Sequence, residues 1–113
     1  MEASATYMSV RISPQKARLV VDQIRGKSVS EALNILNFTK KRVTHDVEKI
    51  LRSAVSNAEQ KSENLDVDDL VVARAFVNEG PRQKRIRPAP MGRAYRYQRR
   101  TSHITVVVEA PED

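Results

Sequence analysis

The sequence predicts an α+β fold in which three helices pack on a small three-stranded antiparallel sheet and a long β-hairpin protrudes. The first part of the chain contains three segments with apolar residues at helical spacing, and the second part contains two runs rich in β-branched residues. Between these two runs lies a segment of about 20 residues that is rich in basic residues and turn formers and has few apolar side chains. Because 113 residues suffice for one modest core, we expect a single domain over residues 1–113. Its globular body would comprise residues 1–79 and 101–113, and an extended arm would comprise residues 80–100.

The chain begins with a predicted strand and a predicted helix. Residues 3–12 read as a short strand that ends with Val10 and Ile12. Ser13 and Pro14 are typical of a helix N-cap followed by proline at the first helical position. Apolar residues then recur at helical spacing as far as Gly26, which is a natural C-terminal stop.

Two further helices are predicted before residue 64. Ser28 and Glu31 match a capping box, which opens a second short helix. The longest helix is expected over about Lys40 to Ser62. Its apolar stripe is the strongest periodic signal in the sequence and consists of Val43, Val47, Ile50, Leu51, Ala54, Val55 and Ala58.

The second half of the chain predicts strands. Residues 70–77 and 104–108 are β-rich runs that flank the basic segment. A structureless loop of this length inside a compact domain is unusual, so we expect a long antiparallel hairpin. Ten residues on each side of the turn would make the hairpin project by about 30 Å from the body. Pro88, Pro90 and Gly92 cluster near the midpoint, where the turn is needed. A two-stranded ribbon is marginal alone in water, so we expect it to become rigid inside its partner.

The net charge of +6 is concentrated in one internal segment. Residues 81–100 hold eight of the 20 basic residues and no acid, whereas the rest of the chain holds 12 basic and all 14 acidic residues. Repulsion within such a block opposes compaction, so the block is stable mainly against a counter-charge. This pattern indicates a polyanionic partner, either nucleic acid or an acidic membrane surface. A solvated basic loop without a specific partner is the alternative, which the flanking strands disfavour.

The residue types of the arm favour RNA as the partner. Arginine outnumbers lysine seven to one in residues 81–100, and guanidinium groups form bidentate bonds to phosphate and stack on bases. Tyr95 and Tyr97 alternate with Arg96, so rings and guanidinium groups point to opposite sides of a strand. Stacking of the rings on unpaired bases and packing of the rings across the ribbon are equally compatible with this spacing. A folded RNA is favoured, and DNA stays open.

Two smaller basic groups lie in the predicted body. Lys40, Lys41 and Arg42 stand at the expected start of the long helix, where the helix dipole disfavours cations unless an anion also binds there. Arg11, Lys16 and Arg18 surround the start of the first helix in the same way. For each group a solvated surface role is as compatible with the sequence as RNA binding.

Catalytic, metal-binding and membrane functions find no support. His45 and His103 are the only histidines and have no partner at metal-ligand spacing, so surface or structural roles are expected. No cofactor is expected, because glycine-rich phosphate loops, nucleophile elbows and cysteines are missing. No apolar run reaches the roughly 20 residues of a membrane span, and the N-terminus does not read as a signal peptide. An acidic cluster lacks the pattern of a calcium loop and is expected to solvate a turn; it contains Glu63, Asp66, Asp68 and Asp69.

Several sequence motifs, in unbroken order over nearly the whole chain, are together typical of one protein family. The body segments that carry the resemblance are residues 10–20 (VRISPQKARLV), 24–27 (IRGK), 56–59 (SNAE) and 78–81 (NEGP). The most specific segments lie in and beside the arm: residues 84–88 (KRIRP), 92–94 (GRA) and 100–106 (RTSHITV). With these segments the chain resembles the bacterial ribosomal large-subunit protein 22 family.

The resemblance implies a structural, non-enzymatic role in the large ribosomal subunit. The implied partners are 23S-type ribosomal RNA, neighbouring ribosomal proteins and the nascent peptide, with no homo-oligomer, in the cytoplasm or in a bacterial-type organelle. In that family a small α+β body sits at the subunit surface, and the hairpin threads inward so that its tip lines the peptide exit tunnel. The tip here would be Ala89, Pro90, Met91 and Gly92. The family usually has an arginine and a small residue after Pro88, so Ala89 and Pro90 should make this tip stiffer and less positive.

Both the residues and the resemblance give a set of expected RNA contacts. The basic members of the arm and of the first helix are implied by the resemblance, and the remaining residues come from the charge and ring patterns. The set is Arg11, Lys16, Arg18, Lys40, Lys41, Arg42, Arg82, Lys84, Arg85, Arg87, Arg93, Tyr95, Arg96, Tyr97, Arg99 and Arg100.

Two other functions stay open on sequence grounds. The first is a free-standing architectural module that inserts its ribbon into a nucleic-acid groove. Co-sedimentation with large subunits at high salt would exclude it. The second is a small hydrolase that uses the acidic cluster, which alanine substitutions at Asp66, Asp68 and Asp69 would test.

Overall fold

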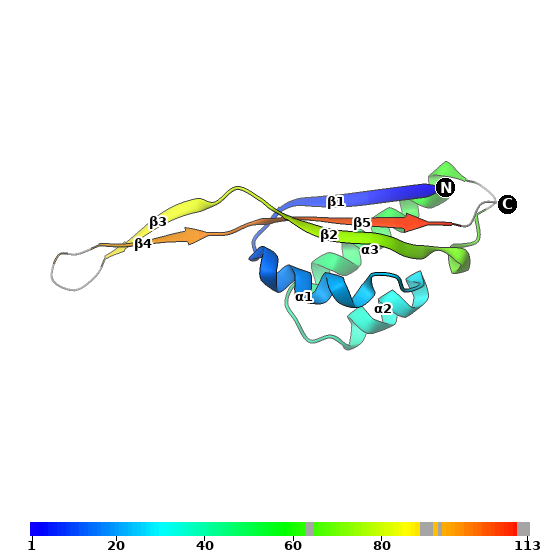
Figure 1. The fold of residues 1–113 in the computed structure, drawn as a ribbon, viewed down its shortest axis with the longest axis horizontal. Coiled ribbons are helices and arrows are strands. Elements are labelled where there is room, and N and C mark those ends of the chain that lie inside the picture. The colour runs from blue at the N-terminus through cyan, green and yellow to red at the C-terminus, as the bar shows by residue number, and fades with distance from the viewer. Residues whose placement is uncertain (63–64, 89–91, 93, 111–113) are drawn as a thin grey trace.

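The computed structural model describes residues 1–62, 65–88, 92 and 94–110, and for residues 83, 85–88 and 94–99 it describes the backbone. In chain order the elements are β1 (Glu2–Val10), α1 (Pro14–Ile24), α2 (Val29–Phe38), α3 (Thr44–Lys61), a short 3-10 helix (Val67–Asp69), β2 (Val71–Glu79), β3 (Gln83–Pro88), β4 (Ala94–Arg99) and β5 (Ser102–Glu109). The molecule measures 68 × 26 × 16 Å, because the β3–β4 hairpin extends far from the body (Figure 1). The predicted α+β class with a protruding hairpin is confirmed.

The body contains an antiparallel sheet with the strand order β1-β5-β2. The last strand in the sequence, β5, is therefore the central one, and both of its neighbours are edge strands. In the register, Val106 of β5 faces Ala5 of β1 and Ala75 of β2. Side chains alternate between the two faces of a strand, so these three positions share one face of the sheet.

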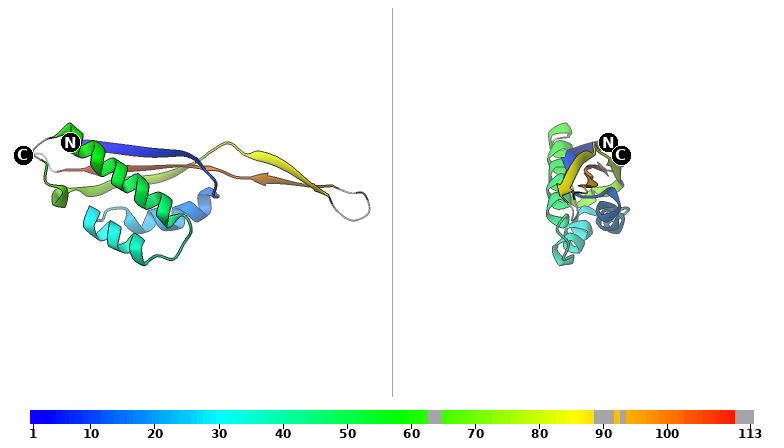
Figure 2. Two further views of the ribbon diagram at one scale, coloured as in Figure 1. Left: turned by 180° about the vertical axis from the view of Figure 1, so that it is seen from behind. Right: turned by 90° about the vertical axis from the view of Figure 1, so that its left-hand side faces the viewer.

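The three helices cover one face of the sheet (Figure 2). The longest helix, α3, packs on β1 and β5, and α1 packs on β2. Leu51, Val47 and Ile104 are fully buried between these layers, and such burial contributes about 1.5–3 kcal/mol for each large side chain. Of the predicted α3 stripe, six residues belong to the buried core and Val55 packs against it.

The first two helices begin and end close to where the sequence predicts. Ser13 is the N-cap of α1 with Pro14 at the first helical position, although the Ser13 side chain makes no cap bond. Gly26 follows the C-cap with φ +80°, a conformation that suits glycine. The backbone N–H of Glu31 donates to Ser28 Oγ at 3.3 Å, which confirms the N-cap of α2.

The predicted start of α3 was wrong by four residues. The helix begins at Thr44, and Lys40, Lys41 and Arg42 precede it in the turn after α2. The chain needs these residues to reverse direction between two packed helices, and buried Val43 fixes the end of the turn. The three cations therefore stand on a surface turn and not within the first turn of the helix.

The free edge of β2 is closed by arginines of α1 and its C-cap. Arg18 Nη2 donates to the Val77 carbonyl at 3.0 Å. The Nε and Nη2 groups of Arg25 both donate to the Ala75 carbonyl, at 3.1 and 2.6 Å. Edge carbonyls left open could pair with another chain, so these contacts both attach α1 and protect the sheet.

The free edge of β1 is closed in the same manner by α3. Asn57 Nδ2 donates to the Ser4 carbonyl at 2.8 Å, and Lys61 Nζ donates to the Glu2 carbonyl at 2.9 Å. Each outer strand is thus joined to a helix through side-chain donors as well as through the apolar core.

Substitution of Arg25 by methionine should lower the free energy of unfolding by about 1–2 kcal/mol, because the half-buried Ala75 carbonyl loses charged donors. Arg52→Met is the matched control. Among the described residues Arg52 pairs with Glu48, one turn away on α3, and such pairs contribute about 0.5 kcal/mol or less. Urea unfolding of both variants measures the difference, and equal losses would contradict a role for Arg25 in closing the edge.

Candidate RNA interface

The basic arm is a two-stranded ribbon that continues the direction of β2 and β5 (Figure 1). Strands β3 and β4 pair antiparallel from Gln83↔Arg99 near the body to Pro88↔Ala94 near the tip. The ladder is interrupted at residues 80–82 and 100–101, so the ribbon forms a separate sheet. Of the predicted tip, Gly92 is exposed with φ +73°, as a turn requires, whereas Ala89, Pro90 and Met91 lie outside the described residues.

The ribbon register places arginine and tyrosine positions opposite each other. Arg85 pairs with Tyr97, and Arg87 pairs with Tyr95. Residues directly opposite each other in an antiparallel pair share a face, so these four positions lie on one face and Arg96 lies on the other. One face of the ribbon therefore carries alternating cationic and aromatic residue types, the composition that suits stacked bases and phosphates.

The structure brings cations from separate parts of the sequence to the base of the arm, which consists of residues 79–82 and 100–103. Arg11, Lys16 and Arg18 are exposed just before and within the first half of α1. The start of α1 lies beneath the point where β2 and β5 leave the sheet (Figure 1). Arg82, Lys84 and Arg100 are exposed where the arm begins. The first-helix group and the root of the arm thus form one positive region.

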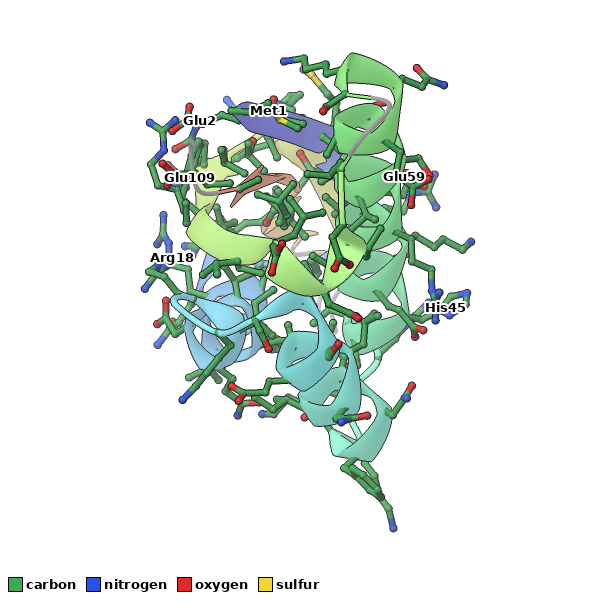
Figure 3. The ribbon with its side chains drawn as sticks, turned by 90° about the vertical axis from the view of Figure 1, so that its right-hand side faces the viewer. Met1, Glu2, Arg18, His45, Glu59 and Glu109 are labelled. Carbon is green, nitrogen blue, oxygen red and sulfur yellow. The ribbon has the colours of Figure 1, made fainter. Side chains whose placement is uncertain are left out.

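The remaining predicted contacts are either elsewhere or only partly described. Lys40, Lys41 and Arg42 are exposed in the turn between α2 and α3. This turn lies at the edge of the helical layer that is farthest from the sheet (Figures 1 and 3). The backbones of Arg85, Arg87, Tyr95, Arg96, Tyr97 and Arg99 lie in β3 and β4, and Arg93 lies outside the described residues.

Hydroxyl groups fix the base of the arm to the body. Thr101 Oγ1 donates to the Pro81 carbonyl at 2.7 Å, and the Gly80 N–H donates to the Thr101 carbonyl at 2.9 Å. Ser102 is fully buried, and its Oγ donates to the Ile12 carbonyl at 2.7 Å. These bonds join the strands of the arm to each other and to the segment that leads into α1. We therefore expect them to set the direction in which the arm leaves the body.

His103 has a structural role in this region. Its Nδ1 accepts the Ser9 backbone N–H at 2.9 Å. Ser9 lies where the register of β1 shifts, and it has the unusual φ of +57°. The sequence indicated a surface or structural histidine without locating its partner, because a register shift in a strand leaves no local signature.

Glu79 is an acid within this positive region, and no pattern in the sequence pointed to it. Its carboxylate pairs with the Arg82 guanidinium three residues further on. This hydrogen bond, the charge of Arg82 and the charges of Arg100 and Arg18 lower the pKa of Glu79. The ionised pair is therefore present above the ordinary carboxyl pKa, and it is lost as the pH falls through the lowered value.

Replacement of Glu79 by glutamine should strengthen RNA binding. The substitution removes an acid from a cationic region and ends the competition of Glu79 with a phosphate for Arg82, so the plot of log affinity against log salt should steepen by about 0.9 for one added contact. Filter binding between 50 and 200 mM salt measures the slope. Glu48→Gln on α3 is the matched control, and equal slopes for Glu79→Gln and the original chain would show that Arg82 makes no added contact.

The described residues offer neither a metal site nor a membrane-spanning helix as an alternative to the basic arm. They contain no group of three or more histidine, cysteine or acidic side chains that could hold a metal ion. Asp66 Oδ1 accepts the Asp68 N–H at 3.0 Å, so this part of the acidic cluster caps the short 3-10 helix. Glu63 lies outside the described residues. None of the described helices is long and apolar enough to cross a membrane.

Comparison with known proteins agrees with this architecture. The profile of a family described as ribosomal protein L22p/L17e matches residues 5–109, a range that contains all three helices and the whole arm. The chain is also similar to the large ribosomal subunit protein uL22 of Solibacter usitatus (strain Ellin6076), with 57% identity over 112 residues that cover 99% of each chain. The resemblance drawn from the sequence motifs is confirmed: the chain belongs to the ribosomal protein L22p/L17e family.

Proposed function

We propose that the protein is a structural constituent of the large ribosomal subunit that binds and organises large-subunit RNA through its basic arm. Family membership supports the subunit and a non-enzymatic role in translation. The observation that carries RNA binding is the arm itself, a projecting ribbon within a segment of eight cations and no acid. Repulsion among these charges opposes the pairing of such a ribbon in solution, and phosphates on both sides would neutralise it.

The body and the arm have different tasks in this proposal. The body, residues 1–79 and 101–113, has a net charge of −2. It would supply a rigid platform at the subunit surface. The arm, residues 80–100, reaches between RNA segments, with the first-helix cations Arg11, Lys16 and Arg18 holding RNA at its root. The hydroxyl bonds of Thr101 and Ser102 support this division, because they fix where the arm points.

The tip of the arm, residues 89–92, would reach the peptide exit tunnel and lie beside the nascent chain. Other large-subunit proteins would be neighbours of the body, and the protein would act at the ribosome of the cytoplasm or of a bacterial-type organelle. The length of the molecule supports the first part of this proposal, because 68 Å is enough to span from a surface position deep into folded RNA.

Crosslinking followed by RNA sequencing tests the proposal. The full chain should give crosslinks in several separate segments of large-subunit RNA, some of them in the interior of the subunit. A variant without the arm should lose the interior crosslinks and keep those at the surface. Crosslinks confined to unrelated RNAs or to DNA would instead favour a free-standing nucleic-acid-binding module.

A further inference from the structure

One exposed aromatic side chain, at the end of α2, belongs neither to the arm nor to the core. Phe38, the last residue of α2, is 86% exposed, more than any other large apolar side chain among the described residues. It lies two positions after Leu36, which is 2% exposed in the core, and two helical positions correspond to about 200° of rotation. Phe38 therefore projects away from the body, and no rotation of its side chain would bring it into the core.

The exposure of Phe38 does not come from a loose helix end. The Thr39 N–H donates to the Leu36 carbonyl at 3.3 Å, and Thr39 Oγ1 donates to the Ile35 carbonyl at 2.7 Å. On the other side of the turn, Val43 is 2% exposed and the Lys41 carbonyl accepts the Thr44 N–H at 3.1 Å. The turn is held on both sides, so the ring is presented on a fixed support.

The residues around Phe38 are of the types that binding sites for single-stranded nucleic acid use. Asn34 and Asn37 are exposed on α2. Asn34 lies one turn before Phe38 on the same side of the helix, and Asn37 is the residue directly before Phe38, about 100° away around the helix. Lys40, Lys41 and Arg42 are exposed in the turn, and no described acid forms an ion pair with them. No acid occurs between Glu31 and Asp46. We call this surface, residues 34–42, the α2–α3 corner.

We propose that the α2–α3 corner binds an unpaired nucleotide of large-subunit RNA, with the base stacked on Phe38. Lys40, Lys41 and Arg42 neutralise the adjoining phosphates, and the amides of Asn34 and Asn37 reach the edge of the base. Because three unpaired cations adjoin the ring, an anionic partner fits this surface better than an apolar protein surface. The inference rests on the proposed function and adds a contact on the face of the body away from the sheet.

Binding of the full-length protein to protein-free 23S-type RNA, measured at fixed salt, tests the ring. Phe38→Leu keeps an apolar side chain of similar size but removes the aromatic face, so affinity should fall by about 5- to 150-fold. Phe38→Tyr should bind within about twofold of the original chain. Phe76→Leu, which changes the exposed phenylalanine on the opposite face of the sheet, is the matched control and should leave affinity unchanged.

Two further measurements separate the contribution of the cations from that of the ring, and RNA from a neighbouring protein as the partner. Replacing Lys40, Lys41 and Arg42 together by glutamine should reduce the salt slope by about 2, as three lost contacts to single-stranded RNA require. Ultraviolet crosslinking should give a nucleotide attached to the peptide that contains Phe38. Unchanged RNA affinity in Phe38→Leu would overturn the proposal, and loss of subunit incorporation alone in Phe38→Ala would show that a neighbouring protein covers the ring. Failure of the original chain to bind this RNA would overturn the proposed function as well.

Discussion

The affinity of the full chain for large-subunit RNA should fall by about 10³-fold or more between 50 and 200 mM salt, as expected when six or more cations contact phosphates. The arm supplies eight basic residues for such contacts, whereas the rest of the chain is net negative. Replacement of residues 80–101 by an Asn-Gly turn should therefore leave a much flatter salt dependence. A steep dependence that survives this deletion would place the main contacts on the body.

The deletion is informative only if the body still folds, and the structure indicates that it does. Glu79 and Ser102 are paired across β2 and β5, so a two-residue turn can join them as a hairpin. The buried core of the described residues contains no member of the arm. We expect thermal unfolding of the shortened chain to remain cooperative, with the sheet retained. A non-cooperative transition would mean that the arm also stabilises the body.

The sequence predicted the elements whose signals are local. The stripe from Val43 to Ala58 predicted which side of α3 is buried, and Ser28 predicted the start of α2, because caps and periodic stripes depend on neighbours within one or two turns. The two β-rich runs beside a long insert predicted the hairpin. The start of α3 was missed since Lys40, Lys41 and Arg42 are good helix formers, and only packing against α2 requires a turn there.

The candidate site was predictable in its charge but not in its contacts. The concentration of cations in residues 81–100 is visible in the sequence, and so are the tyrosine positions. The bonds from Arg18 and Arg25 to carbonyls of β2 join residues 50 or more positions apart, and nothing near either arginine indicates them. Arg18 therefore has one structural contact in addition to its predicted role with RNA, which its other donors can still serve.

Gly80 gives the second large expected effect, because it stands where the arm leaves the body. A Cβ atom at this position would lie 2.5 Å from Thr101 Oγ1 and 3.2 Å from the Thr101 carbonyl carbon. Thr101 is buried, and its hydroxyl bonds to the Pro81 carbonyl, so it cannot move aside without losing that bond. Gly80→Ala should destabilise the protein by about 1–3 kcal/mol, the usual cost of overpacking.

A double-mutant cycle with Thr101→Ala separates this clash from other effects of the substitution. Thr101→Ala alone should cost about 1 kcal/mol through the lost hydrogen bond. In the double variant the alanine at position 80 no longer meets a hydroxyl, so the combined loss should be smaller than the sum by about 1 kcal/mol. Gly80→Ala should also shift the interior RNA crosslinks while leaving those of the body in place, because the arm leaves at a changed angle. Additive losses with unchanged crosslinks would mean that the strands beyond residue 80, and not the close approach of Gly80 to Thr101, set the direction of the arm.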